Sequence, residues 1–447
     1  MIRDHEISYL MNAVRDAECA SIIGLSNMGK STLMRALCHP DVRNAYLGER
    51  CDDWLFIYID CNLMPERSEQ ALHEVILRNA IEALRHAGAK DDILARLDRL
   101  YEQVIQPQTP IRSPLAFNDA INVLCDESGR ALVLLFDEFD DPFGKLDGRT
   151  FLNLRAIKDH LAGALTYITA TEQPLVDVRV DREATEFIEL FASRQRWLGF
   201  MNAADTAAVV REFTTANRAV WQPDEVAFVV DQAGGHPGLL QAVMESFMHV
   251  AGSAPTSTRQ LALSVAKQAF EADDSIRREC AQLWVQLSED EHAELIASAR
   301  HDPGMAEVAK QLQMKHLLAS DGEDAAHRPL IGEVWMTFIK RQALMRPAAE
   351  RGVRVDIESG EVFVDGRRLE QLTELEYKLI VLLNGRANRI VDKYAIVTDV
   401  WGEKFIEEVD DARIEKLVSR LRAKLEPNAE EPRYLITVRG RGYKLVR

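Results

Sequence analysis

The segment GLSNMGKST, residues 24–32, constrains the fold of this chain more than any other stretch of its 447 residues. Its two glycines, lysine and serine have the Gly-x4-Gly-Lys-Ser spacing of a phosphate-binding loop, and it stands between the apolar run ASII and the helix-like run TLMRAL. Glycines let backbone N–H groups turn inward around phosphate oxygens. The segment therefore predicts a strand, a loop and a helix that bind ATP or ADP. The residues expected to contact the nucleotide are Gly24, Asn27, Met28, Gly29, Lys30, Ser31 and Thr32.

A second apolar run, ALVLLFDEFDD at 131–141, ends in carboxylates. Because parallel strands present their carboxyl ends at one edge of a sheet, Asp137 is expected to hold Mg²⁺ together with Ser31. Glu138 is expected to polarise an attacking water, and Lys30 to act through its charge. The alternative is that the acidic residues only cap a buried strand.

The run LTYITAT, residues 165–171, predicts another strand that ends near the same loop. Thr171 is expected to contact the nucleotide there and to sense the γ-phosphate. Threonine is also simply a good strand residue, so that alternative stays open.

Changes of pattern divide the chain into four predicted parts. Strand-length apolar runs alternate with amphipathic stretches over 1–198, which predicts an α/β domain with a parallel sheet. Residues 199–280 predict a helical subdomain, and 281–345 a small helical or winged-helix unit. RPAAERG at 346–352 is the expected linker, and 352–447 predict a small antiparallel sheet, three helices and a terminal hairpin. The predicted fold class is therefore multidomain, α/β plus α.

Charge is distributed unevenly over these parts. The formal net charge is −17, but residues 346–447 hold 20 Lys and Arg against 19 Asp and Glu, while the rest holds 34 against 52. An acidic body repels phosphate backbones, so contact with a polyanion is expected only in the tail.

The segment DDARIEKLVSRLRAKL, residues 410–425, separates into an apolar face and an adjoining basic stripe at ~100° per residue. Alone, such a helix is more simply a solvated helix whose charges suit its dipole. A basic hairpin, TVRGRGYKL, follows at 437–445. Since a basic helix and a basic wing suit a major groove and the neighbouring minor groove, the tail predicts contact with double-stranded DNA.

Residues from about 15 to 340 resemble the signal-transduction ATPases with numerous domains (STAND), within the wider AAA+ group. The resemblance rests on GLSNMGKST, LLFDEFDD, FLNLRAIKD and above all AGGHPGLLQ at 233–241. It implies that Gly235, His236 and Pro237 lie at the ATP site, in a helical subdomain that RQRWLGFMNAADTAAVVREF begins. The chain departs from many relatives because the run ending Ala-Thr-Glu lacks an arginine. Candidates for an arginine finger, each alternatively a structural arginine, are Arg155, Arg194 and Arg196.

The last ~95 residues resemble the winged-helix effector domain of OmpR/PhoB-type response regulators, through LTELEYKLIVLL, DVWG, SRLRAKLE and ITVRGRGYKL in that order. Departures are Ala412 and Leu417, where relatives usually carry polar or basic DNA-contacting side chains. A phosphoryl-accepting receiver domain is the usual partner of such a tail, and a phosphate-binding loop stands in its place. The residues implied to bind DNA are Arg413, Lys416, Ser419, Arg420, Arg422, Thr437, Arg439, Arg441 and Tyr443.

The six cysteines lack the Cys-x-x-Cys spacing of a zinc site, and their scatter indicates reduced thiols. No apolar run approaches the ~20 residues of a membrane helix, so a cytoplasmic protein without a membrane partner is expected.

The expected function is an ATP-switched transcriptional regulator with ATP or ADP and Mg²⁺ as ligands. Nucleotide state is expected to control homo-oligomerisation and DNA binding, with slow ATP hydrolysis as the switch and an effector acting on the middle region. One alternative is a DNA-handling AAA+ ATPase of the origin-recognition or loader type. Another is a sensor ATPase in defence or stress signalling, with the winged helix as an interaction module.

Overall fold

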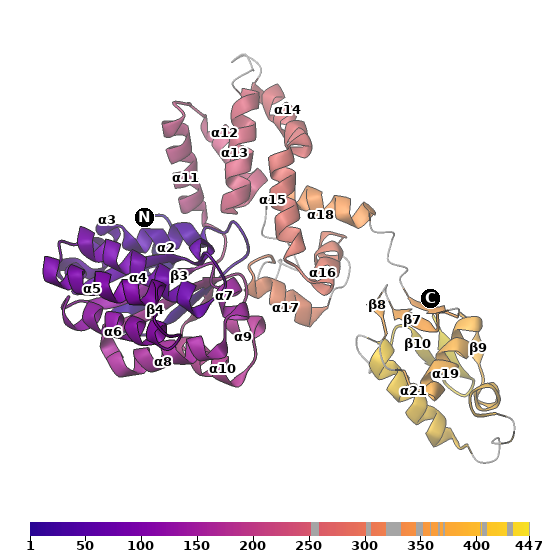
Figure 1. Cartoon of the computed structure of the whole chain (residues 1–447). Coiled ribbons are helices and arrows are strands. Elements are labelled where there is room, and N and C mark those ends of the chain that lie inside the picture. Colours follow the sequence, from indigo (N-terminus) through magenta and orange to yellow (C-terminus); the bar gives the residue numbers. More distant parts are fainter. Residues whose placement is uncertain are drawn as a thin grey trace. The chain divides into compact units, whose positions relative to one another are not determined.

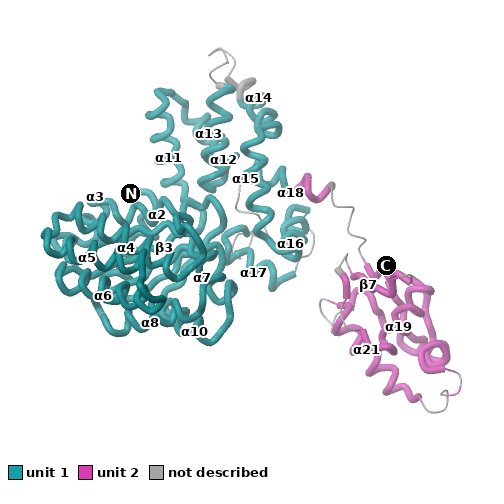
Figure 2. Tube along the Cα trace, viewed as in Figure 1, with its two compact units in different colours: residues 1–338 teal, residues 339–447 magenta. Residues whose placement is uncertain are grey.

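The computed structural model describes two compact units, Met1–Phe338 and Ile339–Arg447 (Figures 1 and 2). The expected linker at 346–352 lies outside the described residues except for Gly352. The described residues are 1–251, 259–300, 305–318, 332–345, 352–357, 359–364, 367–369, 372–402, 404, 409–426 and 432–446.

The first unit contains a five-stranded sheet in which every neighbouring pair is parallel. The strand order is β2-β3-β4-β1-β5, so the strand that leads into the phosphate-binding loop lies inside the sheet. Four strands coincide with the apolar runs in the sequence. The fifth, β5, lies in QRW, a stretch that was expected to begin the helical subdomain. The strands are β1 (Ala20–Ile23), β2 (Trp54–Asp60), β3 (Ala131–Asp137), β4 (Leu165–Thr171) and β5 (Gln195–Trp197).

Helices cover the sheet, and alternation along each strand explains how they are held. Leu55, Ile57 and Ile59 of β2 enter one buried cluster with apolar side chains of the helices α4, α5 and α6, while Phe56 between them faces the other way. Both faces of a parallel sheet must be covered, so its strands are apolar almost throughout. The helices around the sheet are α1 (Asp4–Arg15), α2 (Lys30–Cys38), α3 (Pro40–Leu47), α4 (Glu69–His86), α5 (Asp91–Ile105), α6 (Arg112–Asp126), α7 (Asp140–Lys145), α8 (Gly148–Leu161), α9 (Leu175–Val178) and α10 (Arg182–Ile188).

The chain then becomes helical, and α11, α12, α13 and α14 stand side by side beyond the sheet (Figure 1). The boundary that the sequence analysis placed at 280/281 falls inside one helix, α15. Residues 319–331 of the small helical or winged-helix unit expected at 281–345 lie outside the described residues. These helices are α11 (Ala203–Ala216), α12 (Pro223–Ala233), α13 (Pro237–Ala251), α14 (Arg259–Ala272), α15 (Asp274–Val285), α16 (Glu289–Arg300), α17 (Ala306–Met314) and α18 (Glu333–Met345).

The second unit has two small antiparallel sheets, β6-β7-β8 and β10-β11-β9, around a core of its own. Leu379 and Leu383 of α19 meet Leu417 and Leu421 of α21 in that core. This agrees with the winged-helix fold expected from the sequence. The elements are β6 (Val353–Asp356), β7 (Glu361–Val364), β8 (Arg367–Arg368), α19 (Glu374–Gly385), β9 (Ile390–Val391), α20 (Lys393–Ile396), α21 (Asp411–Leu425), β10 (Leu435–Val438) and β11 (Gly442–Leu445).

Candidate nucleotide site and candidate DNA-binding surface

The phosphate-binding loop joins β1 to α2 with two residues in left-handed backbone conformations. Asn27 has φ 58° and Gly29 has φ 86°, a region that glycine and asparagine enter most readily. Lys30 follows at the start of α2 with only 5% of its surface exposed. Its Nζ donates to the carbonyl oxygens of Gly24, at 2.7 Å, and Leu25, at 3.2 Å. The lysine that would neutralise a phosphate is therefore buried and hydrogen-bonded to its own loop.

Asp137 is the last residue of β3, and β4 separates that strand from β1 in the sheet. Asp137 is only 1% exposed. The Tyr58 hydroxyl of β2 donates to Asp137 Oδ2 at 2.6 Å. Arg35 of α2 lies over the Tyr58 ring, 4.9 Å from its centroid. Burial, and after it the bond to Asp137, raises the pKa of Tyr58, so the phenol keeps its proton and stays a donor. Tyr58 thus fixes the orientation of the Asp137 carboxylate.

Glu138, the next residue, has φ 55°, which a residue with a Cβ rarely adopts. Burial raises the pKa of its carboxyl, and the charge of Lys30 opposes that rise. Such local strain of about 1–3 kcal/mol is typical of functional positions.

Thr169 and Thr171 of β4 are fully buried, and neither hydroxyl has a hydrogen-bond partner among the described residues. The Thr171 carbonyl accepts from the Gly24 N–H at 3.0 Å, which ties the end of β4 to the start of the loop. A buried hydroxyl without a partner is costly, and it leaves Thr171 able to bind a further group.

The segment AGGHPGLLQ, far along the chain, is brought to the same loop. Gly235 has φ 79°, and a Cβ there would stand 2.5 Å from the Met201 carbonyl oxygen. The Gly238 N–H donates to the Asn27 carbonyl at 3.2 Å, and a Cβ added at Gly29 would lie 3.8 Å from Pro237 Cγ. Glycine is thus required at 235, where the segment approaches the backbone of Met201, and the segment also contacts the phosphate-binding loop through Gly238 and Pro237.

His236 lies between those glycines with no exposed surface. Burial lowers the pKa of its imidazole to about 4, so the ring is neutral near pH 7. Nδ1 accepts from the Leu239 N–H at 3.1 Å, and a hydrogen bond with the Ser26 backbone opposes the fall of the pKa. His236 therefore caps α13 and lies against the phosphate-binding loop.

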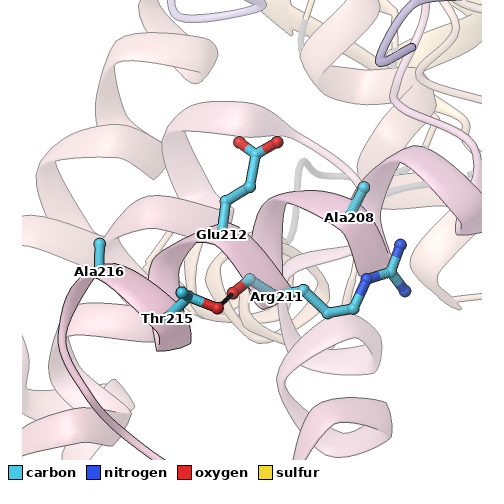
Figure 3. A pocket seen from close by; sticks show the side chains of 5 residues that line it. All are labelled: Ala208, Arg211, Glu212, Thr215 and Ala216. Atoms are coloured by element: carbon cyan, nitrogen blue, oxygen red, sulfur yellow. Dashed lines mark hydrogen bonds between the residues drawn. The ribbon is translucent and has the colours of Figure 1, made fainter.

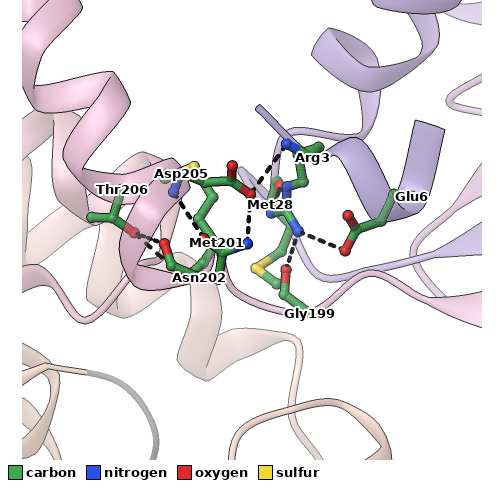
Figure 4. Close-up of polar contacts among 8 residues, drawn as sticks. All are labelled: Arg3, Glu6, Met28, Gly199, Met201, Asn202, Asp205 and Thr206. Atoms are coloured by element: carbon green, nitrogen blue, oxygen red, sulfur yellow. Dashed lines mark hydrogen bonds and ion pairs between the residues drawn. The ribbon is translucent and has the colours of Figure 1, made fainter. Parts of the chain in front are cut away.

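Arg3 is a contributor that the sequence analysis missed (Figure 4). Its guanidinium donates to the carbonyls of Gly199, at 2.5 Å, and Met28, at 3.0 Å, while its backbone N–H donates to Asp205 Oδ2 at 3.1 Å. The side chain also forms an ion pair with Glu6 at 3.5 Å. One residue ahead of the first helix therefore ties the phosphate-binding loop to the beginning of the helical group. An arginine near a chain's start carries no local signal of such a role.

Helix α15 supplies a second set of unforeseen contacts. Gln286, at its C-cap, is hydrogen-bonded to Ser26 of the loop and to Glu172 at the end of β4. Asn27 Nδ2 donates to Glu279 Oε2 at 2.8 Å and to Gln282 Oε1 at 3.1 Å. The tip of the phosphate-binding loop is thus bonded to side chains that lie over 250 residues later.

The three arginines considered as fingers all have structural partners. Arg155 pairs with Asp159 and Glu189. Arg194 pairs with Asp16 and Glu18, and Arg196 lies over the Tyr9 ring at 4.9 Å.

The residues at this edge of the sheet suit a nucleotide with Mg²⁺. A lysine and left-handed loop residues suit phosphates, and Ser31 and Asp137 provide two hard oxygen ligands of the kind Mg²⁺ accepts beside phosphate oxygens. The orphaned Thr171 hydroxyl fits the same reading.

A separate shallow pocket of about 450 Å³ lies along α11 (Figure 3). Its lining comes from one face of that helix and includes no residue of the phosphate-binding loop. The lining residues are Ala208, Arg211, Glu212, Thr215 and Ala216.

In the second unit, α21 has the two faces that the sequence predicts. The apolar face is buried, while Arg413, Lys416, Ser419 and Arg420 are exposed. Lys416 and Arg420 form no ion pair with any described residue. Leu417 is 5% exposed in the core, which explains an apolar side chain at that position by packing. The buried face consists of Ile414, Leu417, Val418, Leu421 and Leu425.

The terminal hairpin pairs β10 with β11 and turns at 439–441. Gly440 has φ 72° and Gly442 has φ 126°, and both Arg439 and Arg441 are exposed at the turn. A Cβ at Gly442 would stand 2.1 Å from the Val391 carbonyl oxygen, so the close approach to β9 requires glycine. Tyr443 is 4% exposed and packs in the core.

Arg422 joins the helix to the hairpin. Its guanidinium donates to the Leu435 carbonyl at 2.6 and 2.8 Å and to Thr437 Oγ1 at 2.7 Å. Two residues predicted to touch DNA therefore contact each other and set the position of the wing.

These features define a P-loop NTPase joined to a winged-helix domain of the response-regulator type. The chain belongs to the family described as novel STAND NTPase 1, whose model matches residues 2–340. Residues 367–445 match the family described as transcriptional regulatory protein, C terminal. Both resemblances expected from the motifs are thereby confirmed.

Individual relatives match parts of the chain. A probable transcriptional regulator ycf27 of Porphyridium aerugineum is 33% identical over 91 residues, which is 20% of this chain and 38% of that protein. The Walker-type ATPase paby2304 of Pyrococcus abyssi is 16% identical over 76% of this chain and 95% of its own, with a TM-score of 0.49. The Klebsiella pneumoniae RstA DNA-binding domain, solved in complex with the RstA box, is 27% identical over 21% of this chain and 91% of its own, with a TM-score of 0.19. The chain thus spans about two fifths of the length of the curated relative.

None of the helices in the described ranges is long and apolar enough to cross a membrane.

Proposed function

We propose that this chain is an ATP-switched transcriptional regulator, in which the nucleotide bound by the first unit controls presentation of the winged helix to DNA. The observation that carries the proposal is the presence, in one chain, of a phosphate-binding loop and a winged helix with an exposed basic edge. The nucleotide unit takes the place of a phosphorylated receiver.

The nucleotide contacts proposed are those expected from the sequence: Gly24, Asn27, Met28, Gly29, Lys30, Ser31 and Thr32 of the loop, together with Thr171 and the 235–237 segment. Lys30 would exchange its loop carbonyls for phosphate oxygens. Ser31 and Asp137 would hold Mg²⁺, which neutralises phosphate charge when bound. Glu138, whose pKa is raised by burial against the opposing charge of Lys30, is the residue proposed to polarise water for slow hydrolysis.

The charge distribution supports oligomerisation on DNA. One small domain with a handful of phosphate contacts binds DNA weakly at physiological salt, and an acidic body weakens it further. Two tails held on adjacent half-sites would recover affinity through effective concentration. Nucleotide-dependent association of the first unit is the proposed way to bring the tails together.

Full-length protein with ADP, with a non-hydrolysable ATP analogue, and with Lys30→Ala tests the proposal. DNA selected from a random library provides the probe, and anisotropy and light scattering give affinity and mass. The ATP analogue should raise affinity by about tenfold or more over ADP, as expected when two tails engage together. Lys30→Ala should remove the difference because its nucleotide site lacks the ammonium, whereas Lys90→Ala, an exposed lysine on the same unit, should keep it.

Three other outcomes separate the alternatives. Identical affinity and mass in all three conditions would reject the switch. ATPase activity stimulated by DNA of any sequence would favour a DNA-handling ATPase of the origin-recognition or loader type. Absence of salt-dependent DNA binding would favour a sensor ATPase whose winged helix binds protein, because counterion release accompanies real DNA contacts.

A further inference from the structure

The side-chain amide of Gln286 is bound to the phosphate-binding loop through both of its polar atoms. Oε1 accepts from the Ser26 N–H at 2.8 Å, and Nε2 donates to Ser26 Oγ at 2.7 Å. Nε2 also donates to Glu172 Oε1 at 2.7 Å, and that same oxygen accepts from Ser26 Oγ at 2.8 Å. Ser26, Glu172 and Gln286 therefore form a closed hydrogen-bonded triangle.

The Gln286 amide oxygen accepts from a backbone N–H that could instead donate to a phosphate oxygen. Phosphate-binding loops hold their ligand with backbone N–H groups, and the Ser26 N–H is a donor of such a loop. An amide oxygen on that N–H satisfies it without a negative charge. A phosphate group that used the Ser26 N–H would have to displace Gln286.

Two carboxylates raise the cost of that displacement for a highly charged ligand. Glu172 belongs to the triangle, and Glu279 accepts from Asn27 Nδ2 at 2.8 Å. Both carboxylates lie on the side of the loop that α15 covers. Glu279 packs closely there, because a Cβ added at Gly238 would stand 2.3 Å from Glu279 Oε2. Adding a terminal phosphate brings negative charge toward them, and like charges at short range are unfavourable.

We propose that Gln286 is a specificity-determining residue of the nucleotide site, which favours a nucleoside diphosphate over a triphosphate by occupying the Ser26 N–H. Binding of a triphosphate breaks the triangle and frees the C-terminal end of α15. The inference rests on the proposed binding of nucleotide by this loop, and it assigns to α15 the reading of the terminal phosphate.

Gln286→Ala tests the inference in the full chain. Affinities for fluorescent ADP and for a fluorescent non-hydrolysable ATP analogue are measured by anisotropy at fixed Mg²⁺. Removing the amide should strengthen binding of the triphosphate about five- to tenfold, the scale expected for one or two hydrogen bonds. ADP affinity should change less than about twofold. Arg278→Ala is the matched control, since Arg278 lies on the same helix and, among the described residues, bonds to Asp274 and Ser275 within that helix.

A second measurement follows the helix itself by amide hydrogen exchange. In the wild type, the ATP analogue should raise exchange over 280–287 relative to ADP, and in Gln286→Ala the two nucleotides should give equal exchange. Equal shifts of both affinities, or an unchanged ratio together with unchanged exchange, would overturn the inference. Failure of the wild type to bind either nucleotide would instead overturn the proposed function, so the two can be told apart. A thermal melt checks folding, which the half-buried Gln286 is not expected to govern.

Discussion

At the scale of single residues, the bond from Tyr58 to Asp137 makes a prediction about metal binding. Tyr58→Phe removes the donor that orients the proposed Mg²⁺ ligand and leaves a buried carboxylate oxygen with one bond fewer. Loss of such an outer-shell partner typically costs 10–100-fold in metal affinity, so the Mg²⁺ concentration that half-saturates nucleotide binding should rise about tenfold.

A Mg²⁺ titration of nucleotide binding measures this effect. Nucleotide affinity in EDTA should stay unchanged, because Tyr58 touches the carboxylate and not the loop. Tyr101→Phe serves as control, since Tyr101 also donates to a carboxylate, that of Glu74, at 2.9 Å. An unmoved Mg²⁺ midpoint would contradict an orienting role for Tyr58.

The same residues show how far a sequence predicts a site. Lys30 and Asp137 are recognisable because loop spacing and a strand's end are local features. Tyr58, Arg3 and Gln286 reach the site only through pairing of strands and packing of helices, and nothing beside them in the chain indicates it. Gly235 was recognised through its motif, although its physical reason is a tertiary contact with Met201.

At the scale of elements, Arg422 joins α21 to the terminal hairpin through hydrogen bonds, whereas Arg439 is exposed at the hairpin turn. We therefore expect the first arginine to stabilise the fold and the second to contact DNA. Arg439→Ala should lower DNA affinity by about three- to tenfold, the loss of one charge-assisted contact, and leave the melting temperature unchanged because Arg439 is exposed at the turn. Arg422→Ala should lower the melting temperature, because it leaves the Leu435 carbonyl and Thr437 without their donor.

Melting curves and DNA titrations at several salt concentrations test the pair. Arg439→Ala should also reduce the slope of log affinity against log salt by about one, as for a single phosphate contact. A stability loss for Arg439→Ala equal to that of Arg422→Ala would show that both are structural.

The elements themselves were mostly predictable because burial leaves its pattern of apolar residues in the sequence. The four strands are continuous apolar runs because both faces of the sheet are covered, and the buried face of α21 repeats with the helical period. The strand β5 was not recognised, since its three residues, two of them polar, are too few to show an apolar run or a period. The division expected at 280/281 falls inside α15. This helix packs against α13 and α14, and its C-terminal end contacts the phosphate-binding loop.

At the scale of the whole molecule, the proposed function predicts that DNA binding depends on the number of tails, because the first unit is acidic and the tail is near neutral. A probe with two half-sites should bind more tightly than a probe with one, by a factor that depends on nucleotide. With the ATP analogue the gain should be on the order of 100-fold, since the second tail binds at a high effective concentration. With ADP it should stay near the twofold expected from site number, because the proposed switch assembles the tails only with the triphosphate.

Half-site spacing sharpens this last test, because two tails held by one assembly fit only some separations. Inserting about five base pairs turns one half-site to the opposite face of the duplex, and about ten restore it. The gain with the ATP analogue should therefore fall and recover with that period. A gain that ignores both nucleotide and spacing would mean that the tails bind independently, and the first unit would then act on DNA binding by some route other than assembly.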